Sequence, residues 1–355
     1  MAIRTVALTL VLLIVGLMLV ACGSDPTPTS APSATATPTT APEPIKVKLL
    51  SGWQPTLGFA NLTEAAVFDT IRKNTGGLVD IERVAGPESV PTFQQFVPVR
   101  DGLFDMVSTT ISYHPEFTNI GSIHNYYPAD ENPYPDRLAC GTENLLSGVY
   151  DSHGIKYLGM AHLYIGVRTF LNEEPDDIMN LSKYRIRSGG AASEVLMKQL
   201  GAATVQVPFG DIYQALERGL VDGMATGGGA SVAQALSWDE VTNYHVTPAQ
   251  GETLLIFLMN MDTWNSIPAD LQKIVLDSFI DINEVIKQPL IDLDQDALKA
   301  MEAEGTLKEI ALSAAESEQW DSISRNAGLE LLIDELPADL AADVREIDSC
   351  LIAKR

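Results

Sequence analysis

The residue of this 355-residue chain best suited to recognise a ligand is Arg187, which ends a short β-type stretch and precedes Ser188-Gly189-Gly190. A guanidinium is a planar fork of N–H donors that matches the two oxygens of a carboxylate. The glycines would let backbone N–H groups approach the same anion at the start of the next helix. Taken alone, these residues fit an exposed arginine at a strand end better than an anion site.

Sequence signatures of exported enzymes are absent. The chain has no Gly-x-Ser-x-Gly elbow, no His-Glu-x-x-His segment and no cysteine pair at zinc spacing. Gly227-Gly228-Gly229 lacks the Lys-Ser/Thr that follows in a phosphate-binding loop. We therefore expect no catalytic residue, no metal ion and no cofactor, and an exported hydrolase is a less favoured class.

The first 44 residues predict a leader and a tether. An apolar run over residues 6–20 ahead of small residues is typical of a signal peptide, here residues 1–21. Leu19-Val20-Ala21-Cys22 resembles the bacterial lipobox, which implies a lipid-modified Cys22; the alternative is an ordinary secretory signal with a chance cysteine. Residues 22–44 are rich in Pro, Thr, Ala and Ser, so we expect a disordered link to the membrane.

The net charge limits the kinds of molecule that the chain can bind, and its cysteines offer a possible disulfide. The formal net charge of −24 argues against nucleic acid and against adsorption to anionic lipid. No later apolar run approaches 18 residues, so we expect no further membrane span. Two cysteines follow Cys22: Cys140 and Cys350. In an exported chain such a pair is a possible disulfide, and two separate buried thiols are the alternative.

The hydrophobic pattern places these residues in two α/β lobes. Strands and helices alternate from Ile45 to Ser108, with Asn61 as an expected helix N-cap, which implies a parallel sheet. A second cycle runs from residue 163 to 224, and a long helix from about 268 to 303 is expected to bend at Pro289 and run behind both lobes. The expected lobes are 45–162 with about 251–288, and 163–250 with about 289–355. Two open sheets place a ligand site in the cleft between them.

Several motifs resemble the DctP-type solute-binding proteins of TRAP (tripartite ATP-independent periplasmic) transporters. The resemblance is dense over about 40 residues and looser from residue 45 to about 310. It rests on Lys73-x-Thr-Gly-Gly-x-Val-x-Ile81, Tyr184-Arg-Ile-Arg-Ser-Gly-Gly190, Val207-Pro-Phe209, Ile212-Tyr-Gln-Ala-Leu216, Val221-Asp-Gly223 and Trp264-x-x-Ile-Pro268. It implies a bilobed periplasmic-binding-protein fold.

The resemblance also implies site residues. In the family, an arginine at the position of Arg187 forms a two-pronged salt bridge with the ligand carboxylate. Arg168 matches a second cationic contact, for which an interlobe salt bridge is the alternative. Phe209 matches an aromatic that packs on the ligand, unless it belongs to the core.

Four other residues are expected near the same rim. Asp211 replaces the family's glutamate beside Tyr213, and helix capping is the alternative for Asp211. Trp53 and Tyr113 follow strands whose ends face the cleft, although lone aromatics there more often serve packing.

One stretch departs from the family pattern. Many members continue after Val221-Asp-Gly223 with Gln-Glu-Asn-Pro, whereas this chain has Met224-Ala-Thr-Gly-Gly-Gly-Ala230, with Thr226 as its only hydroxyl. The loss of these polar side chains puts dicarboxylate and sialic-acid ligands in doubt. It favours an aromatic or branched aliphatic monocarboxylate.

Together these features predict an extracytoplasmic binding lipoprotein. It would close its lobes on a small carboxylate-bearing ligand and deliver it to the membrane subunits of a TRAP transporter. The alternative is an ABC-type binding protein or a ligand-sensing lipoprotein, which would share the fold and differ in partner.

Overall fold

The computed structural model describes residues 43–114, 120 and 134–354. The predicted signal peptide, Cys22 and the tether up to residue 42 lie outside the described residues. Everything reported below belongs to one unit of the chain, which begins at Pro42.

The first sheet has five strands in the order β2-β1-β3-β10-β4. Strand β1 is parallel to both β2 and β3, as the sequence predicted. Strand β10 is antiparallel to β3 and to β4, so the sheet is mixed rather than parallel. These strands are β1 (Ile45–Ser51), β2 (Val79–Ala85), β3 (Met106–Thr109), β4 (Ile155–His162) and β10 (Leu254–Asn260).

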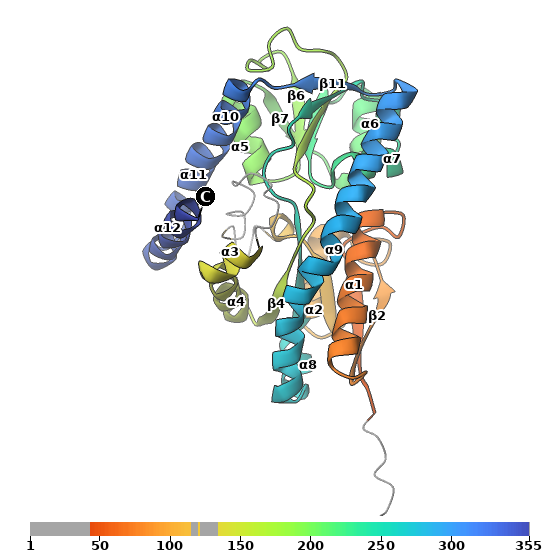
Figure 1. Ribbon diagram of the computed structural model, residues 1–355, viewed down its shortest axis with the longest axis vertical. Coiled ribbons are helices and arrows are strands. Elements are labelled where there is room, and N and C mark those ends of the chain that lie inside the picture. Colours follow the sequence, from red (N-terminus) through yellow and green to blue (C-terminus); the bar gives the residue numbers. More distant parts are fainter. Residues whose placement is uncertain (1–42, 115–119, 121–133, 355) are drawn as a thin grey trace, which may run out of the picture. The chain divides into compact units, whose positions relative to one another are not determined.

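The second sheet has six strands in the order β11-β9-β5-β8-β6-β7 (Figure 1). Strand β6 is parallel to β7 and β8, whereas β5 is antiparallel to β8 and β9. Strands β9 and β11 were missed in the sequence, because each is a four-residue segment among helical patterns. The strands are β5 (Arg168–Leu171), β6 (Arg185–Ser188), β7 (Ala203–Gln206), β8 (Gly223–Thr226), β9 (Tyr244–Thr247) and β11 (Lys308–Ala311).

Helix α9 (Ala269–Glu304) passes both sheets, as the sequence predicted, with Pro289 inside it. At 1.5 Å per residue it is about 54 Å long. It packs on α1 (Gly58–Asn74) and β4 beside the first sheet and on α7 (Gly229–Ala235) beside the second. Its close approach to β4 requires Gly159, because a Cβ atom there would lie 2.5 Å from the Phe279 ring.

The expected N-cap of α1 is wrong. The N-cap residue is Leu57, and Asn61 lies inside the helix, where its side-chain amide donates a 2.7 Å hydrogen bond to the Pro55 carbonyl oxygen. The helix therefore begins about one turn earlier than a cap at Asn61 would place it.

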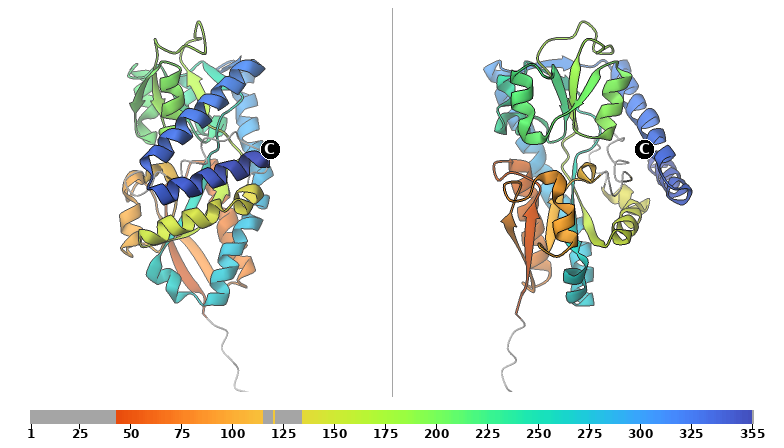
Figure 2. Two further views of the ribbon diagram at one scale, coloured as in Figure 1. Left: turned by 90° about the vertical axis from the view of Figure 1, so that its left-hand side faces the viewer. Right: turned by 180° about the vertical axis from the view of Figure 1, so that it is seen from behind.

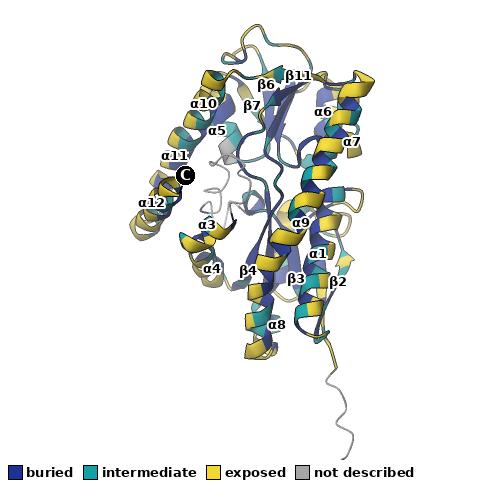
Figure 3. Ribbon diagram, viewed as in Figure 1, coloured by how far each residue is buried: buried dark blue, intermediate teal, exposed yellow. Residues whose placement is uncertain are grey.

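Further helices cover the sheets (Figure 2), and their outward faces are exposed (Figure 3). None of the helices in residues 43–114 and 134–354 combines the length and apolar character needed to cross a membrane. They include α2 (Phe96–Arg100), α3 (Tyr134–Ala139), α4 (Thr142–Ser152), α5 (Ala191–Gln199), α6 (Ile212–Glu217) and α8 (Met261–Ser266).

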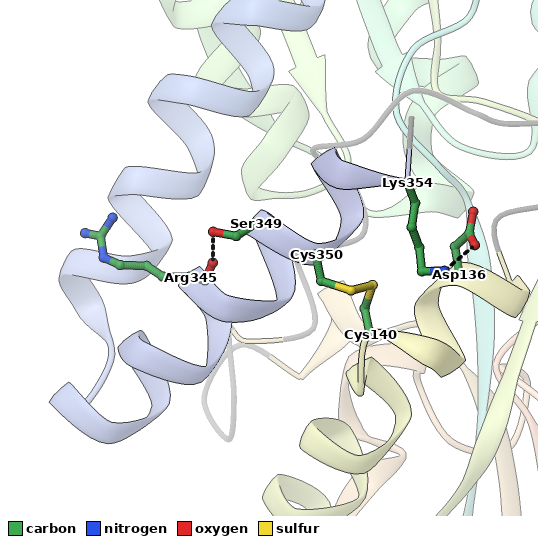
Figure 4. The surroundings of a disulfide bond; sticks show 6 residues. All are labelled: Asp136, Cys140, Arg345, Ser349, Cys350 and Lys354. Carbon is green, nitrogen blue, oxygen red and sulfur yellow. Dashed lines mark hydrogen bonds and ion pairs between the residues drawn. A yellow bond between two sulfur atoms is a disulfide. The ribbon is translucent and has the colours of Figure 1, made fainter.

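The C-terminal segment, residues 314–353, returns to the first sheet's side. It contains α10 (Ala314–Ile323), the π-helical turn η6 (Ser324–Gly328), α11 (Leu329–Glu335) and α12 (Ala338–Ala353). Cys350 in α12 is joined by a disulfide to Cys140, between α3 and α4, with 5.7 Å between the Cα atoms (Figure 4).

Candidate ligand-binding site

A cavity of about 80 Å³ lies where loops of the two sheets meet. Trp53 and Tyr113 reach it from loops of the first sheet, and Arg187 and Thr226 reach it from the strand ends of the second. A cavity of this size suits a compact ligand.

Arg187 is the only Lys, Arg or His among the described residues that line this cavity. It lies in β6 and is 3% exposed. Its Nε donates to the Val207 carbonyl oxygen at 3.1 Å, and its Nη1 donates to Thr226 Oγ1 at 3.4 Å. Gly189 makes room for this side chain, because a Cβ atom there would lie 2.6 Å from Nη1.

The charge of Arg187 has no protein counter-ion within the described part of the chain: no Asp or Glu there lies within ion-pair distance. Burial lowers the pKa of Arg187 to about 10, with the nearby Tyr113 as a smaller opposing influence, so the guanidinium stays charged at neutral pH. A buried, uncompensated charge is strongly unfavourable. An anionic ligand at this position would remove that penalty.

Aromatic rings form one wall of the cavity. The Trp53 ring lies 5.6 Å from the ring of Tyr113 and 6.5 Å from that of Phe209, measured between centroids. Phe209 in turn packs on Trp238 at 5.2 Å. Because Trp53 belongs to the first sheet's side and Phe209 to the second's, these contacts join the two halves directly beside the ligand position.

The structure therefore brings five of the predicted site residues to one cavity. They are Trp53, Tyr113, Arg187, Phe209 and Thr226.

Arg168 lies apart from the cavity. Its neighbours on β5, Val167 and Thr169, line the cavity, and strand alternation turns Arg168 to the opposite face. There its Nη2 lies 3.4 Å from Asp294 Oδ2 of α9, and its Nη1 lies 3.3 Å from His245 Nδ1 of β9. Asp294 belongs to the part of α9 that the sequence assigned to the same lobe as Arg168, so this ion pair lies within one lobe and is not the interlobe salt bridge left open as the alternative.

Asp211 and Tyr213 also lie outside the cavity lining. Asp211 is exposed and directly precedes α6. Its side chain makes no capping hydrogen bond there, so the capping alternative fails as well. The Tyr213 hydroxyl donates to Glu240 Oε2 at 3.0 Å on the surface, which accounts for its orientation.

Three residues that line the cavity each have a buried polar atom without a hydrogen-bond partner among the described residues. These atoms are Trp53 Nε1, Thr169 Oγ1 and Thr253 Oγ1. Thr253 adjoins Gly227, where a Cβ atom would lie 2.8 Å from its hydroxyl oxygen. Buried polar atoms are nearly always paired, so these three groups are suited to polar atoms of a bound molecule.

Sequence reasoning missed both threonines. Thr169 follows Arg168 directly, and strand alternation predicts that only one of the two faces the cleft, but it does not say which. Thr253 precedes β10, which is about 90 residues from β4, its neighbour in the sheet, and no local pattern places it at the cavity.

Glu252 is the only acidic residue among the described lining residues, and its charge is already compensated. Its carboxylate lies 2.5 Å from Arg137 Nη2 and 3.4 Å from His162 Nδ1. The local field at the cavity is therefore set by Arg187 and is positive.

A family model described as bacterial extracellular solute-binding protein, family 7 (DctP), matches residues 62–331. The chain belongs to the DctP family. This is a family of solute-binding receptors and not of enzymes. The matched region contains every strand of the second sheet and every strand of the first except β1.

Individual DctP relatives are distant in sequence. The chain is 30% identical over 153 residues to a C4-dicarboxylate-binding periplasmic protein of Rhodobacter capsulatus, a match over 42% of this chain and 44% of that protein. It is 22% identical over 302 residues to a monocarboxylate 2-oxoacid-binding periplasmic protein of Nostoc, over 80% of this chain and 79% of that protein.

Solved structures show the same fold. A TRAP transporter solute-binding protein from Bordetella bronchiseptica, with calcium and picolinate, aligns with a TM-score of 0.77 at 17% identity, covering 88% of this chain and 93% of that one. One from Pseudoalteromonas atlantica, with sodium and pyruvate, aligns with a TM-score of 0.75 at 20% identity, covering 88% and 95%.

Proposed function

We propose that this DctP-family protein captures a small monocarboxylate with a second, uncharged polar group and delivers it to the membrane subunits of a TRAP transporter. The observation that carries the proposal is the buried Arg187, whose charge no described carboxylate balances. A ligand carboxylate would accept hydrogen bonds from its Nη atoms, and such charge-assisted bonds are among the strongest in proteins.

A single cation at the cavity favours a single carboxylate. A second carboxylate would be buried without a partner among the described lining residues, where Arg187 stands alone. Desolvating an unpaired carboxylate costs several kcal/mol, about enough to cancel the gain at Arg187. The expected preference is therefore for monocarboxylates, as the Met224–Ala230 stretch also suggests.

The unpartnered groups of Trp53, Thr169 and Thr253 favour a neutral polar substituent. An oxo or hydroxyl group next to the carboxylate would accept from the indole N–H and exchange hydrogen bonds with the threonine hydroxyls. The relative from Nostoc is named for binding monocarboxylate 2-oxoacids, and the one from Pseudoalteromonas atlantica has pyruvate bound. Both are consistent with this ligand class.

Delivery and anchoring complete the proposal. Closure of the two halves around the ligand would present one defined surface to the transporter. Lipid modification of Cys22 would keep the protein beside its membrane subunits. A gene neighbourhood with two membrane subunits of unequal size and no ATPase would favour a TRAP partner over an ABC one.

A matched set of small acids tests the ligand class. Thermal unfolding of the full-length protein is measured with pyruvate, lactate, propionate and succinate. At 100 times the dissociation constant, a ligand that binds only the folded state raises the free energy of unfolding by about 2.7 kcal/mol. We expect pyruvate or lactate to raise the melting temperature more than propionate, which lacks the second polar group. Stabilisation by succinate alone would contradict the monocarboxylate assignment.

A further inference from the structure

The C-terminal segment contributes one residue to the ligand cavity. Ser324, the first residue of the π-helical turn η6, lines the cavity together with Arg187. Ser324 is 8% exposed. π-Helical turns are uncommon and occur frequently at functional sites.

The first half of this segment is fixed to the second sheet's side. Turn η6 packs on α5, which supplies Ser193, Leu196 and Met197 to the same cavity. Trp320 in α10 is fully buried, and its Nε1 donates to the Met179 sulfur at 3.0 Å. Ser324 therefore moves with α5.

The second half is fixed to the first sheet's side by a covalent bond. Cys350 in α12 is bonded to Cys140, and Lys354 Nζ lies 3.3 Å from Asp136 Oδ1 (Figure 4). An open cavity of about 310 Å³ remains between α4 and α12, lined in part by Leu145 and Ile347. The disulfide adds a covalent attachment to noncovalent ones: Val344, Ile347 and Leu351 of α12 are buried in the same hydrophobic core cluster as Leu145 of α4. The exposed ion pair contributes little.

We propose that Ser324 is a ligand contact and that the Cys140–Cys350 disulfide positions it by tying the C-terminal segment to the first sheet's side. The segment would then form a wall of the cavity that depends on both halves of the protein. The contact role rests on the proposed function, whereas the positioning role does not require a ligand.

Substitutions in the full-length protein test the contact. Ser324→Leu fills cavity space, so the dissociation constants for pyruvate and lactate should rise at least tenfold; Ser324→Ala should raise them about two- to fivefold. Ser322→Leu, on the exposed face of α10, is the matched control and should change them less than twofold. Binding by both Ser324 variants as tight as wild type would overturn the contact role, and an unchanged melting temperature for Ser324→Ala would show that its fold is intact.

Hydrogen exchange tests the positioning without any ligand. In the Cys140→Ser/Cys350→Ser variant, amides of η6 and α5 should exchange at least tenfold faster than in wild type, while those of α1 stay unchanged. If the amides of η6 and α5 exchange at the same rates in the variant as in wild type, the positioning role is overturned. If no acid binds the wild-type protein, the proposed function and the contact role fail together, and the exchange result still decides the role of the disulfide.

Discussion

The Nε atom of Arg187 donates a 3.1 Å hydrogen bond to the carbonyl oxygen of Val207, which fixes the edge of the guanidinium that can reach a ligand. Nε is occupied by the protein, and Nη1 shares one proton with Thr226. The remaining donors lie at the end of the guanidinium, on Nη1 and Nη2. A carboxylate would therefore bind end-on, with one oxygen on each Nη atom.

Arg187→Lys should weaken binding of the best acid from the pyruvate and lactate pair by roughly ten- to hundredfold. Lysine keeps the charge but loses the two-pronged geometry, and one charge-assisted hydrogen bond contributes about 1.5–3 kcal/mol. Arg187→Ala should weaken binding further, because the bound carboxylate would be left uncompensated. Calorimetric titration measures both effects.

Arg185 supplies the control for these variants. It lies on the same strand, but it is exposed and pairs with Asp222 at 2.6 Å. Arg185→Lys and Arg185→Ala should leave the dissociation constant unchanged within about twofold. Equal losses at positions 185 and 187 would point to a general effect on β6 rather than to a ligand contact.

Thr169→Val should weaken lactate binding about two- to tenfold and leave propionate binding unchanged. Valine has nearly the shape of threonine and lacks the hydroxyl, and a neutral hydrogen bond contributes about 0.5–1.5 kcal/mol. Thr169→Ser, which keeps the hydroxyl, is the control. A proportional loss for both acids would mean that Thr169 shapes the cavity rather than binding the second polar group.

Arg168→Met should lower stability more than affinity. The substitution leaves Asp294 buried without its cation, and breaking a buried pair costs about 3–5 kcal/mol. Urea unfolding should report that loss, while the dissociation constant of the folded protein for lactate changes little. The opposite pattern, lost affinity with unchanged stability, would restore the ligand contact that the family resemblance implies for Arg168.

Acid should destabilise the protein through His114. Burial lowers the pKa of this fully buried side chain from 6.5 to about 4. Between these values the unfolded chain binds more protons at His114 than the folded chain does. The contribution of neutral His114 to the free energy of unfolding is therefore complete above about pH 6.5 and is lost as the pH falls toward 4. The full loss is about 3 kcal/mol.

His114→Gln removes this titration and isolates it from other groups. The difference in free energy of unfolding between wild type and variant, measured with urea at pH 7 and pH 5, should change in the variant's favour at pH 5. A difference that is independent of pH would show that His114 titrates alike in both states.

Cys22→Ser should release the protein from the membrane without changing its melting temperature or its affinity for lactate. The reason is that the proposed lipid anchor at Cys22 precedes the unit that begins at Pro42. Fractionation of cells that express each form measures the effect. Wild-type amounts of the variant in the membrane fraction would exclude an anchor at this cysteine.

Local patterns predicted most of the framework. The alternation of Ile45–Leu50 and the apolar spacing of α9 follow directly from which faces must be buried, so β1 and the long helix were found. The position of β10 was not, because an antiparallel strand between β3 and β4 depends on a pairing across more than 90 residues. No single-sequence pattern encodes that pairing.

The site residues likewise include some that the sequence predicted and some that depend on contacts between distant segments. Arg187 was found because the motif around it, Tyr184 to Gly190, resembles that of the DctP family; the residues taken alone favoured an exposed arginine. The orientation of Arg168 depends on Asp294, more than 100 residues later, and was therefore left open. Ser324 was missed because a π-helical turn has no distinctive composition, and its contact with α5 is made only in the folded protein.

The indole of Trp53 packs near Tyr113 on the first sheet's side and Phe209 on the second's, and Trp53 lines the ligand cavity. The other three tryptophans, Trp238, Trp264 and Trp320, are buried outside the cavity lining. Fluorescence emission that changes when an acid is added would therefore originate chiefly at Trp53. The protein thus contains an intrinsic optical reporter, through which ligand capture can be followed in real time without a label.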